Sequence, residues 1–353
     1  MTKDKAKNGA AGADIKNISS ASSDSAVAVR TFWERNRLTH GYLLRKKIGS
    51  VFISIARAIL LFGLCFLILQ PILNKISVSF MTEEDLYNPI VISIPLHPTI
   101  DNYTLSAQIM NYSKGLVTSL IVALTIGILQ VAMSTLVGYG FARFQFPLKK
   151  LWFAFVMLII LVPPQTISSS LYLHFSSFDV LGIIKLLTGN TINLRGSAIP
   201  YYLMSAGCMG LKNGLYIYLV RQYFRNIPID LEEAAYIDGC GTVRTFIRIM
   251  LPQAKPIITS CFLFAFVWQW TDGFYSKLFL GNVSLLSRNL NTLVDTLSTY
   301  LMRMLGIKST VPPAYGNAIL ATGTLMFIMP LIILYLFAQR GFVESLSSSG
   351  IKM

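Results

Sequence analysis

The side chains most often used for redox, nucleophilic or metal chemistry are few in this 353-residue chain, and their spacing does not suit such chemistry. The four cysteines form no CxxC pair, and the three histidines are far apart in the sequence and lack ligand spacing. Three of the cysteines lie in apolar segments, where small core residues are expected. Clustered histidines, paired carboxylates and nucleophile motifs are not found. We therefore expect no catalytic residue, no metal site and no cofactor bound by this chain.

A second set of residues stands out because charged, aromatic or helix-breaking side chains interrupt apolar segments. A charge within lipid is costly, so Lys212 should face a bundle interior or a water-filled cavity. The pair Pro163-Pro164 removes two backbone donors and must kink or break its helix. A simple kink remains an alternative for the prolines, and core packing or interface anchoring for the tryptophans. The candidate residues for a solute pathway are Pro163, Pro164, Lys212, Trp270 and Asp272.

The most informative segment is polar and lies between two very apolar ones. Residues 231–252 read LEEAAYIDGCGTVRTFIRIMLP. Acidic residues at 230, 232 and 233 suit the start of a helix, where Asp230 and Glu233 could alternatively form a capping box. Gly239 and Gly241 end this helix, one of them in the left-handed conformation. Thr242 can cap the next helix, so the segment predicts a rigid helix-turn-helix.

The second helix of this hairpin has one apolar stripe. The stripe has the spacing i, i+3, i+4 and i+7 and consists of Val243, Phe246, Ile247 and Met250. Arg244 and Arg248 lie on the opposite face. We expect the stripe to pack along a helix bundle, while the first helix offers Glu233, Ala234 and Ala235 to another protein.

Composition places this hairpin in a membrane protein. The chain is 54% hydrophobic and 13% charged, with a mean hydropathy of +0.58, which is too apolar for a soluble domain of this size. A hydrocarbon core is crossed by about 20 residues of helix. We predict an all-α, polytopic membrane helix bundle with six transmembrane helices. The predicted spans are Val51–Leu73, Gly115–Phe141, Leu151–Phe175, Ser197–Val220, Pro256–Leu280 and Ala318–Ala338. The span Ser197–Val220 is interrupted by the segment Gly210–Gly214.

The net charge of +14 could suggest nucleic acid as a partner, but its distribution argues otherwise. With the N-terminus taken as cytoplasmic, twenty Lys and Arg residues fall on the cytoplasmic side of the predicted spans and seven on the other side. This is the positive-inside bias of a membrane protein. It predicts a multi-pass protein of a bacterial-type cell membrane, with both termini and the 231–252 hairpin in the cytoplasm.

The domain organisation follows from the composition along the chain. Residues 1–28 are rich in Ser, Ala, Lys and Asp, and predict a disordered cytoplasmic tail. Residues 29–50 mix aromatic and basic side chains, so they form either an amphipathic helix on the membrane surface or a simple topology anchor. Residues 51–345 are the predicted six-helix domain, and residues 346–353 a cytoplasmic tail.

The hairpin resembles the EAA signature of permease subunits of binding-protein-dependent ABC importers. The fixed positions of that signature are matched by Glu233, Ala234, Ala235, Gly239, Ile249, Leu251 and Pro252. Asp238, the segments 221–224 and 338–343, and the sequence GYGFAR at 138–143 are similar to the carbohydrate branch, in particular to the second maltose-type permease. The resemblance covers about residues 50–345. It differs in the tail after 343 and in having Thr271 where the family usually has Asn.

The resemblance implies a division of labour between subunits. The hairpin, including Asp238, would dock on a separate cytoplasmic ABC ATPase dimer, and ATP would bind there, since this chain has no GxxxxGK[ST] loop. A second homologous permease would complete the translocation path, and an extracytoplasmic binding protein would deliver a sugar. The alternatives are a permease for another solute, such as a peptide, amino acid or phosphate, an ion-coupled secondary transporter and a membrane-embedded enzyme.

Overall fold

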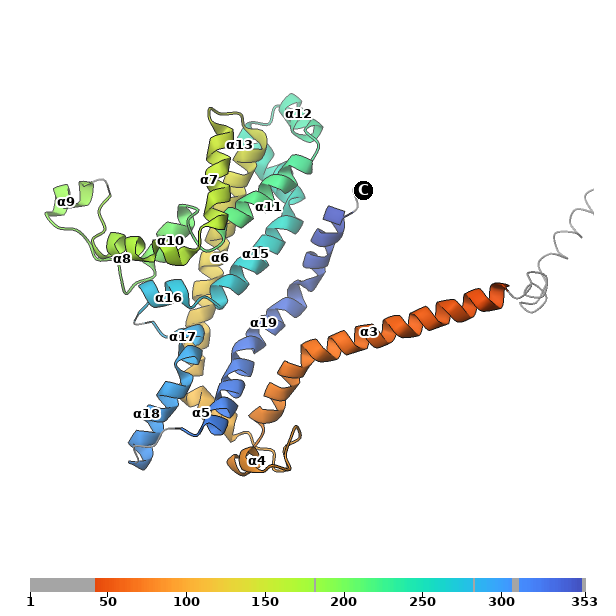
Figure 1. Ribbon diagram of the computed structural model, residues 1–353. Coiled ribbons are helices and arrows are strands. Elements are labelled where there is room, and N and C mark those ends of the chain that lie inside the picture. Colours follow the sequence, from red (N-terminus) through yellow and green to blue (C-terminus); the bar gives the residue numbers. More distant parts are fainter. Residues whose placement is uncertain (1–41, 181, 282, 307–310, 351–353) are drawn as a thin grey trace, which may run out of the picture. The chain divides into compact units, whose positions relative to one another are not determined.

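The computed structural model describes residues 42–180, 182–281, 283–306 and 311–350. The predicted tail 1–28 and most of the basic segment 29–50 lie outside the described residues. The chain divides into two compact units, residues 1–73 and 74–353. The described part of the chain is helical, and its one extended pairing is an isolated bridge between Phe178 and Ile192. This helical architecture agrees with the predicted all-α class (Figure 1).

The described part of the first unit is the larger part of α3 (Tyr42–Ser79), a helix that continues into the second unit. Its side chains from Val51 to Leu73 are all exposed within this chain. A helix that is apolar on every side is expected in apolar surroundings, such as lipid or a neighbouring membrane protein. The predicted span Val51–Leu73 is therefore present as a continuous helix.

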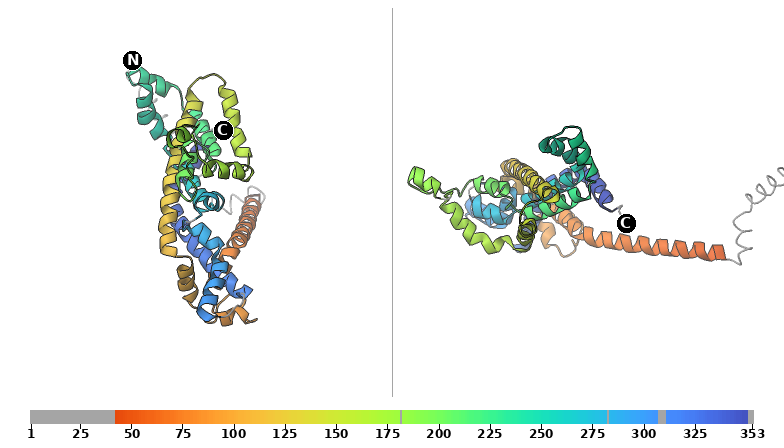
Figure 2. Two further views of the ribbon diagram at one scale, coloured as in Figure 1. Left: turned by 90° about the vertical axis from the view of Figure 1, so that its left-hand side faces the viewer. Right: turned by 90° about the horizontal axis from the view of Figure 1, so that it is seen from above.

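The second unit is organised around α6 (Tyr112–Arg143), which packs against α11 (Asn213–Asn226) and α15 (Lys255–Trp270). Helix α15 also packs against α19 (Pro313–Gly350). Figures 1 and 2 show α11 and α15 beside α6. A glycine on α6 lets α11 pack closely against it. A Cβ added at Gly138 would lie only 2.8 Å from Cγ1 of Val220 on α11.

Shorter helices connect these long ones. They are α4 (Glu83–Tyr87), α5 (Asp101–Ile109), α7 (Lys149–Leu161), α8 (Ser168–Ser176), α9 (Ile183–Thr188), α10 (Ile199–Ala206), α16 (Phe274–Phe279), α17 (Leu286–Asn291) and α18 (Leu293–Leu305). Between α7 and α8 lies a short 3₁₀ turn, Pro164–Ile167. The hairpin segments α12 to α14 are described below with the site.

The prediction of six spans is not confirmed. Among the described residues, three helices are long and apolar enough to cross a membrane alone: Ile48–Ser79, Tyr112–Arg143 and Pro313–Gln339. Two bent helix pairs raise this number to at most five. One pair is α7 with Pro164–Ser176, bent by 98° at the Pro163-Pro164 pair. The kink or break predicted there is therefore present.

The predicted interruption of the span Ser197–Val220 is confirmed, because this stretch forms the two short helices α10 and α11. The chain between them carries Cys208 and Lys212 in the left-handed conformation, which no α-helix tolerates. Buried polar groups surround this break. The Nδ2 of Asn213 donates to Oγ of Ser134 on α6 at 2.9 Å. The predicted span Pro256–Leu280 is also divided, since α15 ends at Trp270 and α16 starts at Phe274.

Candidate functional site

The 231–252 segment forms the predicted hairpin. Helix α12 (Asp230–Ile237) is followed by a turn, then α13 (Thr242–Thr245), a π-helical turn (Phe246–Met250) and α14 (Leu251–Gln253). Gly239 has a φ of +80°, so it is the left-handed residue that the sequence predicts. The N–H of Cys240 bonds to the carbonyl of Ala235 at 2.9 Å, and that of Gly239 to Tyr236 at 3.0 Å. These two bonds are a Schellman motif, which closes α12 firmly.

The predicted N-terminal caps are wrong. Ile229 precedes α12 without a side-chain cap, so the Asp230 and Glu233 carboxylates form no capping box. Gly241 is the cap position of α13, and Thr242 is already its first helical residue. The hairpin is therefore held by its turn and by contacts with the bundle rather than by its first residues.

An ion pair that the sequence analysis missed ties α12 to the bundle. The Nε of Arg143, the last residue of α6, donates to Oε1 of Glu232 at 2.9 Å. A second guanidinium nitrogen of Arg143 donates to the carbonyl of Ile227 at 2.7 Å. The Glu232 side chain is 6% exposed and that of Arg143 10%. Two sequence features could have indicated this pair. Arg143 is a basic residue at the end of the GYGFAR motif, and α12 begins with three acidic residues.

The two faces of α12 have different surroundings. Ala235 is 3% exposed and packs inward, so it does not present a surface in this structure, and its part in coupling stays a prediction. Glu233, Ala234, Asp238 and Gly239 are exposed, and so is Ile237, at 86%. The outward face of the hairpin therefore combines a free carboxylate, a small residue and an uncovered apolar side chain.

The apolar stripe predicted for the second helix is only half buried. Phe246 and Met250 pack in a core cluster with Ile249, but Val243 is 71% exposed and Ile247 54%. The reason is the π-helical turn, because a wider turn shifts the buried register away from an α-helical period. The motif residues Ile249 and Leu251 are half-buried, and Pro252 is exposed at the start of α14.

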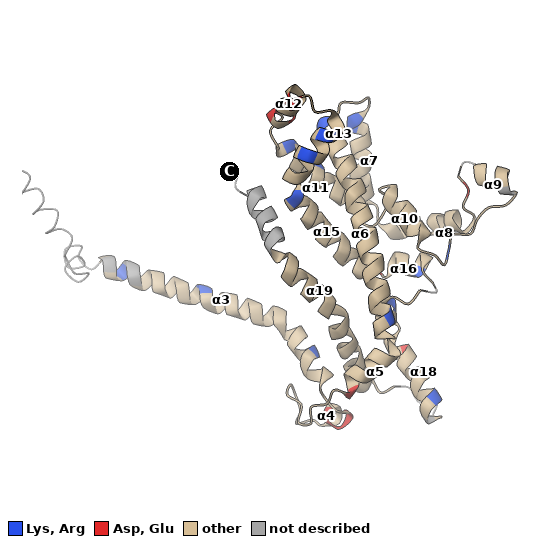
Figure 3. Cartoon of the chain, turned by 180° about the vertical axis from the view of Figure 1, so that it is seen from behind, with Lys and Arg blue, Asp and Glu red and all other residues tan. Residues whose placement is uncertain are grey.

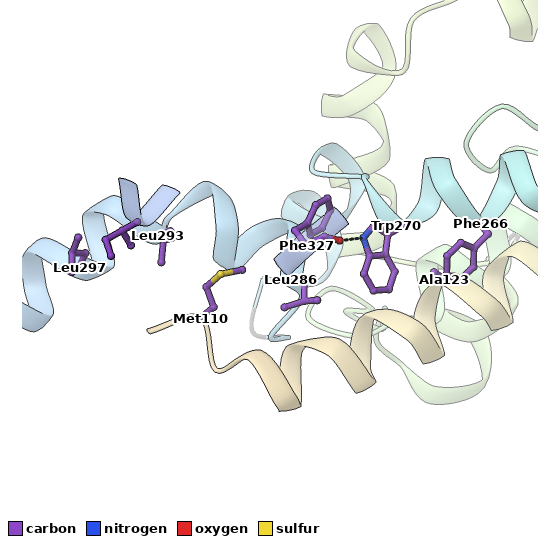
Figure 4. Packing of buried hydrophobic residues seen from close by; sticks show 9 residues of the cluster. Met110, Ala123, Phe266, Trp270, Leu286, Leu293, Leu297 and Phe327 are labelled. Carbon is purple, nitrogen blue, oxygen red and sulfur yellow. Dashed lines mark hydrogen bonds between the residues drawn. The ribbon is translucent and has the colours of Figure 1, made fainter. Parts of the chain in front are cut away.

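Of the candidate pathway residues, two belong to the protein core. Trp270 is 2% exposed, and its Nε1 donates to the carbonyl of Phe327 at 3.2 Å (Figure 4). Asp272 is 7% exposed. Its carboxylate accepts from the hydroxyl of Tyr201 and from the backbone N–H groups of the first turn of α16, including Ser276 at 2.9 Å. Both side chains are buried and hydrogen-bonded within the chain, and the role of Trp270 and Asp272 in a solute pathway stays a prediction.

The other pathway candidates lie on the surface of the chain. Lys212 is exposed, and its Nζ lies 4.9 Å from the ring centroid of Trp268, which is 44% exposed. Pro163 is exposed and Pro164 is half-buried at the sharp bend after α7. Among the described residues, no group of three or more metal-ligating side chains is found.

Comparisons with known proteins agree with this architecture. A permease protein of Pyrococcus horikoshii, described as a probable ABC transporter permease, is 35% identical over 192 residues. That match covers 53% of this chain and 63% of the relative, so the chain spans less than two thirds of that relative's length. The maltodextrin transport system permease protein MdxG of Bacillus subtilis is 27% identical, over 72% of this chain and 81% of the relative.

Two further matches extend the comparison. The sn-glycerol-3-phosphate transport system permease protein UgpE of Yersinia pestis is 27% identical, over 66% of this chain and 72% of the relative. Among solved structures, a bacterial ABC transporter involved in the import of the acidic polysaccharide alginate aligns with a TM-score of 0.60 at 17% identity. It covers 83% of this chain and 97% of that chain, which establishes a shared fold.

The family comparison covers most of the second unit. Residues 130–347, from the middle of α6 through the hairpin to the last described helix, match the family of binding-protein-dependent transport system inner membrane components. This range is more than half of the chain, and it includes every position of the EAA-like hairpin. The chain is a multi-pass membrane protein that belongs to the family of binding-protein-dependent transport system inner membrane components.

Proposed function

We propose that this chain is the permease subunit of an ATP-driven importer of sugars, and that the outward face of its hairpin is the docking surface for a separate ATPase. The observation that carries the proposal is the division of α12 into two faces. Glu232 and Ala235 fix it to the chain, whereas Glu233, Ala234 and Ile237 are exposed beside them. Ile229, Leu231, Tyr236 and Ile237 are all exposed on or next to this short helix, and a group of exposed apolar side chains is typical of an interaction surface.

The hairpin is built to transmit a displacement into the bundle. Arg143 ends α6, so a force on α12 reaches a 32-residue helix through a buried ion pair. Met250, in the π-helical turn of the hairpin, is fully buried in the cluster that contains Val220 of α11 and Cys261 of α15. A movement of α12 would therefore shift three packed helices as a group, which is how binding energy at one site can change the population of inward and outward states.

The other subunits follow from this division of labour. ATP would be bound and hydrolysed by the ATPase dimer, an extracytoplasmic binding protein would deliver the solute, and a second homologous permease would complete the pathway. Helix α3 exposes apolar side chains on every side, which suits contact with lipid or with the second permease. We place the hairpin and both termini in the cytoplasm of a bacterial-type cell, because the basic residues gather on that side.

An oligosaccharide is the favoured solute because the relative MdxG is described as part of a maltodextrin transport system. A second candidate is a phosphorylated small molecule, since the relative UgpE is described for sn-glycerol 3-phosphate at the same identity. In this chain the exposed Trp268 beside Lys212 offers a face for a sugar ring and a charge for an anion.

The test is transport by the complex purified with its co-expressed subunits and reconstituted in liposomes. We expect ATP-dependent uptake of labelled maltodextrin, and loss of both uptake and ATPase co-purification in the double variant Glu233→Lys, Gly239→Asp. Glu84→Lys is the matched control, because Glu84 is an equally exposed carboxylate on α4, remote from the hairpin in the sequence. Unchanged uptake in the double variant would refute ATPase docking at this face, and uptake of glycerol 3-phosphate alone would replace the sugar by the second candidate.

A further inference from the structure

A basic pocket lies between the turn that joins α6 to α7 and the last turns of α11. It has a volume of about 970 Å³. Its lining includes four basic side chains, Lys149, Lys150, Arg221 and Arg225, and no acidic one. Lys and Arg near α7 and α11 lie at the same end of α6 as the hairpin (Figure 3). We propose that this pocket binds the phosphate group of an anionic phospholipid from the adjacent membrane leaflet.

The charges of the pocket are not neutralised within the chain. None of the four basic residues forms an ion pair with a carboxylate in the described ranges. Lys149 Nζ donates to the carbonyl of Phe144 at 2.6 Å, which leaves its positive charge unbalanced. Bringing four cations to one pocket is unfavourable unless an anion joins them, and a phosphate can accept several charge-assisted hydrogen bonds at once.

Arg221 is the best positioned of the four for such a bond. Its guanidinium carbon lies 3.9 Å from the ring centroid of Phe153, which holds the planar group against one wall of the pocket. Its Nε is buried, and no hydrogen-bond acceptor for it is found among the described residues. A guanidinium fixed by stacking loses less freedom when it binds an anion. Helix α7 begins at Lys149, so its first turn adds positive potential to the same place.

The rest of the lining explains why a lipid fits better than a soluble anion or an acidic protein segment. Phe141, Phe146 and Leu151 line the pocket beside the basic groups. Leu151, Phe155 and Leu158 continue as exposed apolar side chains along α7. A ligand with an anionic head and acyl chains matches both parts. Trp152 is 53% exposed in the first turn of α7, where aromatic side chains mark the membrane interface.

The experiment uses the full chain purified in a mild detergent and measures bound lipid by native mass spectrometry. Phosphatidylglycerol and phosphatidylcholine are offered at equal concentration. We expect selective retention of phosphatidylglycerol, and the double variant Lys150→Gln, Arg225→Gln should weaken it about 30-fold, from about 1 kcal/mol for each basic residue near an anionic surface. Both side chains are exposed, so the variant should fold. Arg221→Gln removes the guanidinium stacked on Phe153 and should also weaken the retention of phosphatidylglycerol.

The matched control is Arg244→Gln, Arg248→Gln, which removes two exposed charges from the hairpin and should leave retention unchanged. Equal loss in both double variants would overturn the proposal, because it would show general attraction to the leaflet. Equal retention of phosphatidylcholine would overturn it too. Displacement of the lipid by inorganic phosphate at the same concentration would assign the site to a free anion. Absence of the lipid from the assembled complex, with Lys150 cross-linked to an acidic residue of another subunit, would assign the pocket to a protein contact.

Discussion

Arg143 Nε and Glu232 Oε1 lie 2.9 Å apart, and both side chains are almost fully buried. These residues are 89 positions apart, at the end of α6 and in the first turn of α12. The pair is thus a direct polar link between the hairpin and α6, the helix around which the second unit is organised. Removing one member leaves the other as a buried charge without its counter-ion.

We expect Glu232→Gln to destabilise the chain by about 3–5 kcal/mol, the range for breaking a buried ion pair. Thermal unfolding of the purified chain measures this. Glu233→Gln is the control, since Glu233 is exposed one residue away and should change stability little. The double variant Arg143→Met, Glu232→Leu should recover most of the loss, because two apolar groups leave no unpaired charge. Equal stability of Glu232→Gln and wild type would contradict the structural role of the pair.

Gly239→Ala should weaken the hairpin through its backbone alone. Its φ is +80°, and a Cβ added there would meet nothing within 4 Å. The cost is therefore the left-handed conformation, about 1–2 kcal/mol. Gly241→Ala is the matched control, with a φ of −75° and equally open space. Hydrogen exchange of the α12 amides should rise in the first variant and stay unchanged in the second. The same rise in both would point to a general role for chain flexibility.

Gly138→Ala should separate α6 from α11. The new Cβ would lie 2.8 Å from Cγ1 and 3.0 Å from Cβ of Val220, and 3.2 Å from the backbone N of Arg221. Overpacking of this kind costs about 1–3 kcal/mol. Gly140→Ala adds the same methyl group to the same helix with its nearest neighbour at 3.8 Å. The melting temperature should fall for position 138 and remain near wild type for position 140.

Asp272→Asn tests whether Asp272 has a structural role in the core or a role in the solute pathway. Its carboxylate accepts from Tyr201 and from three backbone N–H groups of α16. Losing charge-assisted bonds in a buried site should cost about 1.5–3 kcal/mol, seen as lower thermal stability. Asp295→Asn, on the exposed face of α18, is the control. If Asp272→Asn altered solute selectivity without any loss of stability, the result would support a role for Asp272 in the solute pathway.

Acid should loosen the loop that precedes α5. The N–H of His97 donates to Oδ2 of Asp85 at 2.9 Å and holds the pKa of this carboxyl below its ordinary value. A lowered pKa means that the stabilisation is present above about pH 4, the ordinary value for Asp, and is lost as the pH falls through the lower folded value. Proteolysis of residues 86–100 should therefore increase only in strong acid. Asp85→Asn should make the loop equally sensitive to proteolysis at neutral pH. A rate of proteolysis that does not change with pH in the wild type would argue against this bond.

The hairpin was predictable from the sequence because local chemistry determines it. Gly239 needs a left-handed turn, and the spacing from Glu233 to Pro252 fits two short helices joined by that turn. Apolar composition likewise predicted α3, α6 and α19. The interruption of Ser197–Val220 was predictable from the polar segment Gly210–Gly214, but the left-handed Cys208 and Lys212 were not, since hydropathy does not report backbone conformation.

Pairings between distant residues were beyond reach from one sequence. The bond from Arg143 to Glu232 and the enclosure of Asp272 by Tyr201 depend on which helices meet, and no local pattern encodes that. Residue type left both a pathway and a packing role open for Trp270, and its ring contacts with Phe266 and Phe327 favour packing. The apolar stripe of the second hairpin helix is only half buried for a different reason. The prediction assumed a period of 3.6 residues, which does not hold through a π-helical turn.

That wider turn, Phe246–Met250, also preserves the orientation of the hairpin. Each residue of a regular α-helix turns the chain by about 100°, and a π-helical turn holds one residue more at a smaller rotation per residue. Removing one residue from this turn would let it close into an α-helix and would leave Thr245 buried and Val243 exposed. Removing one residue from α13 itself would instead rotate the residues before it by about 100°. The π-helical turn is therefore the place in the second hairpin helix where the chain can lose a residue without changing the direction in which the hairpin faces.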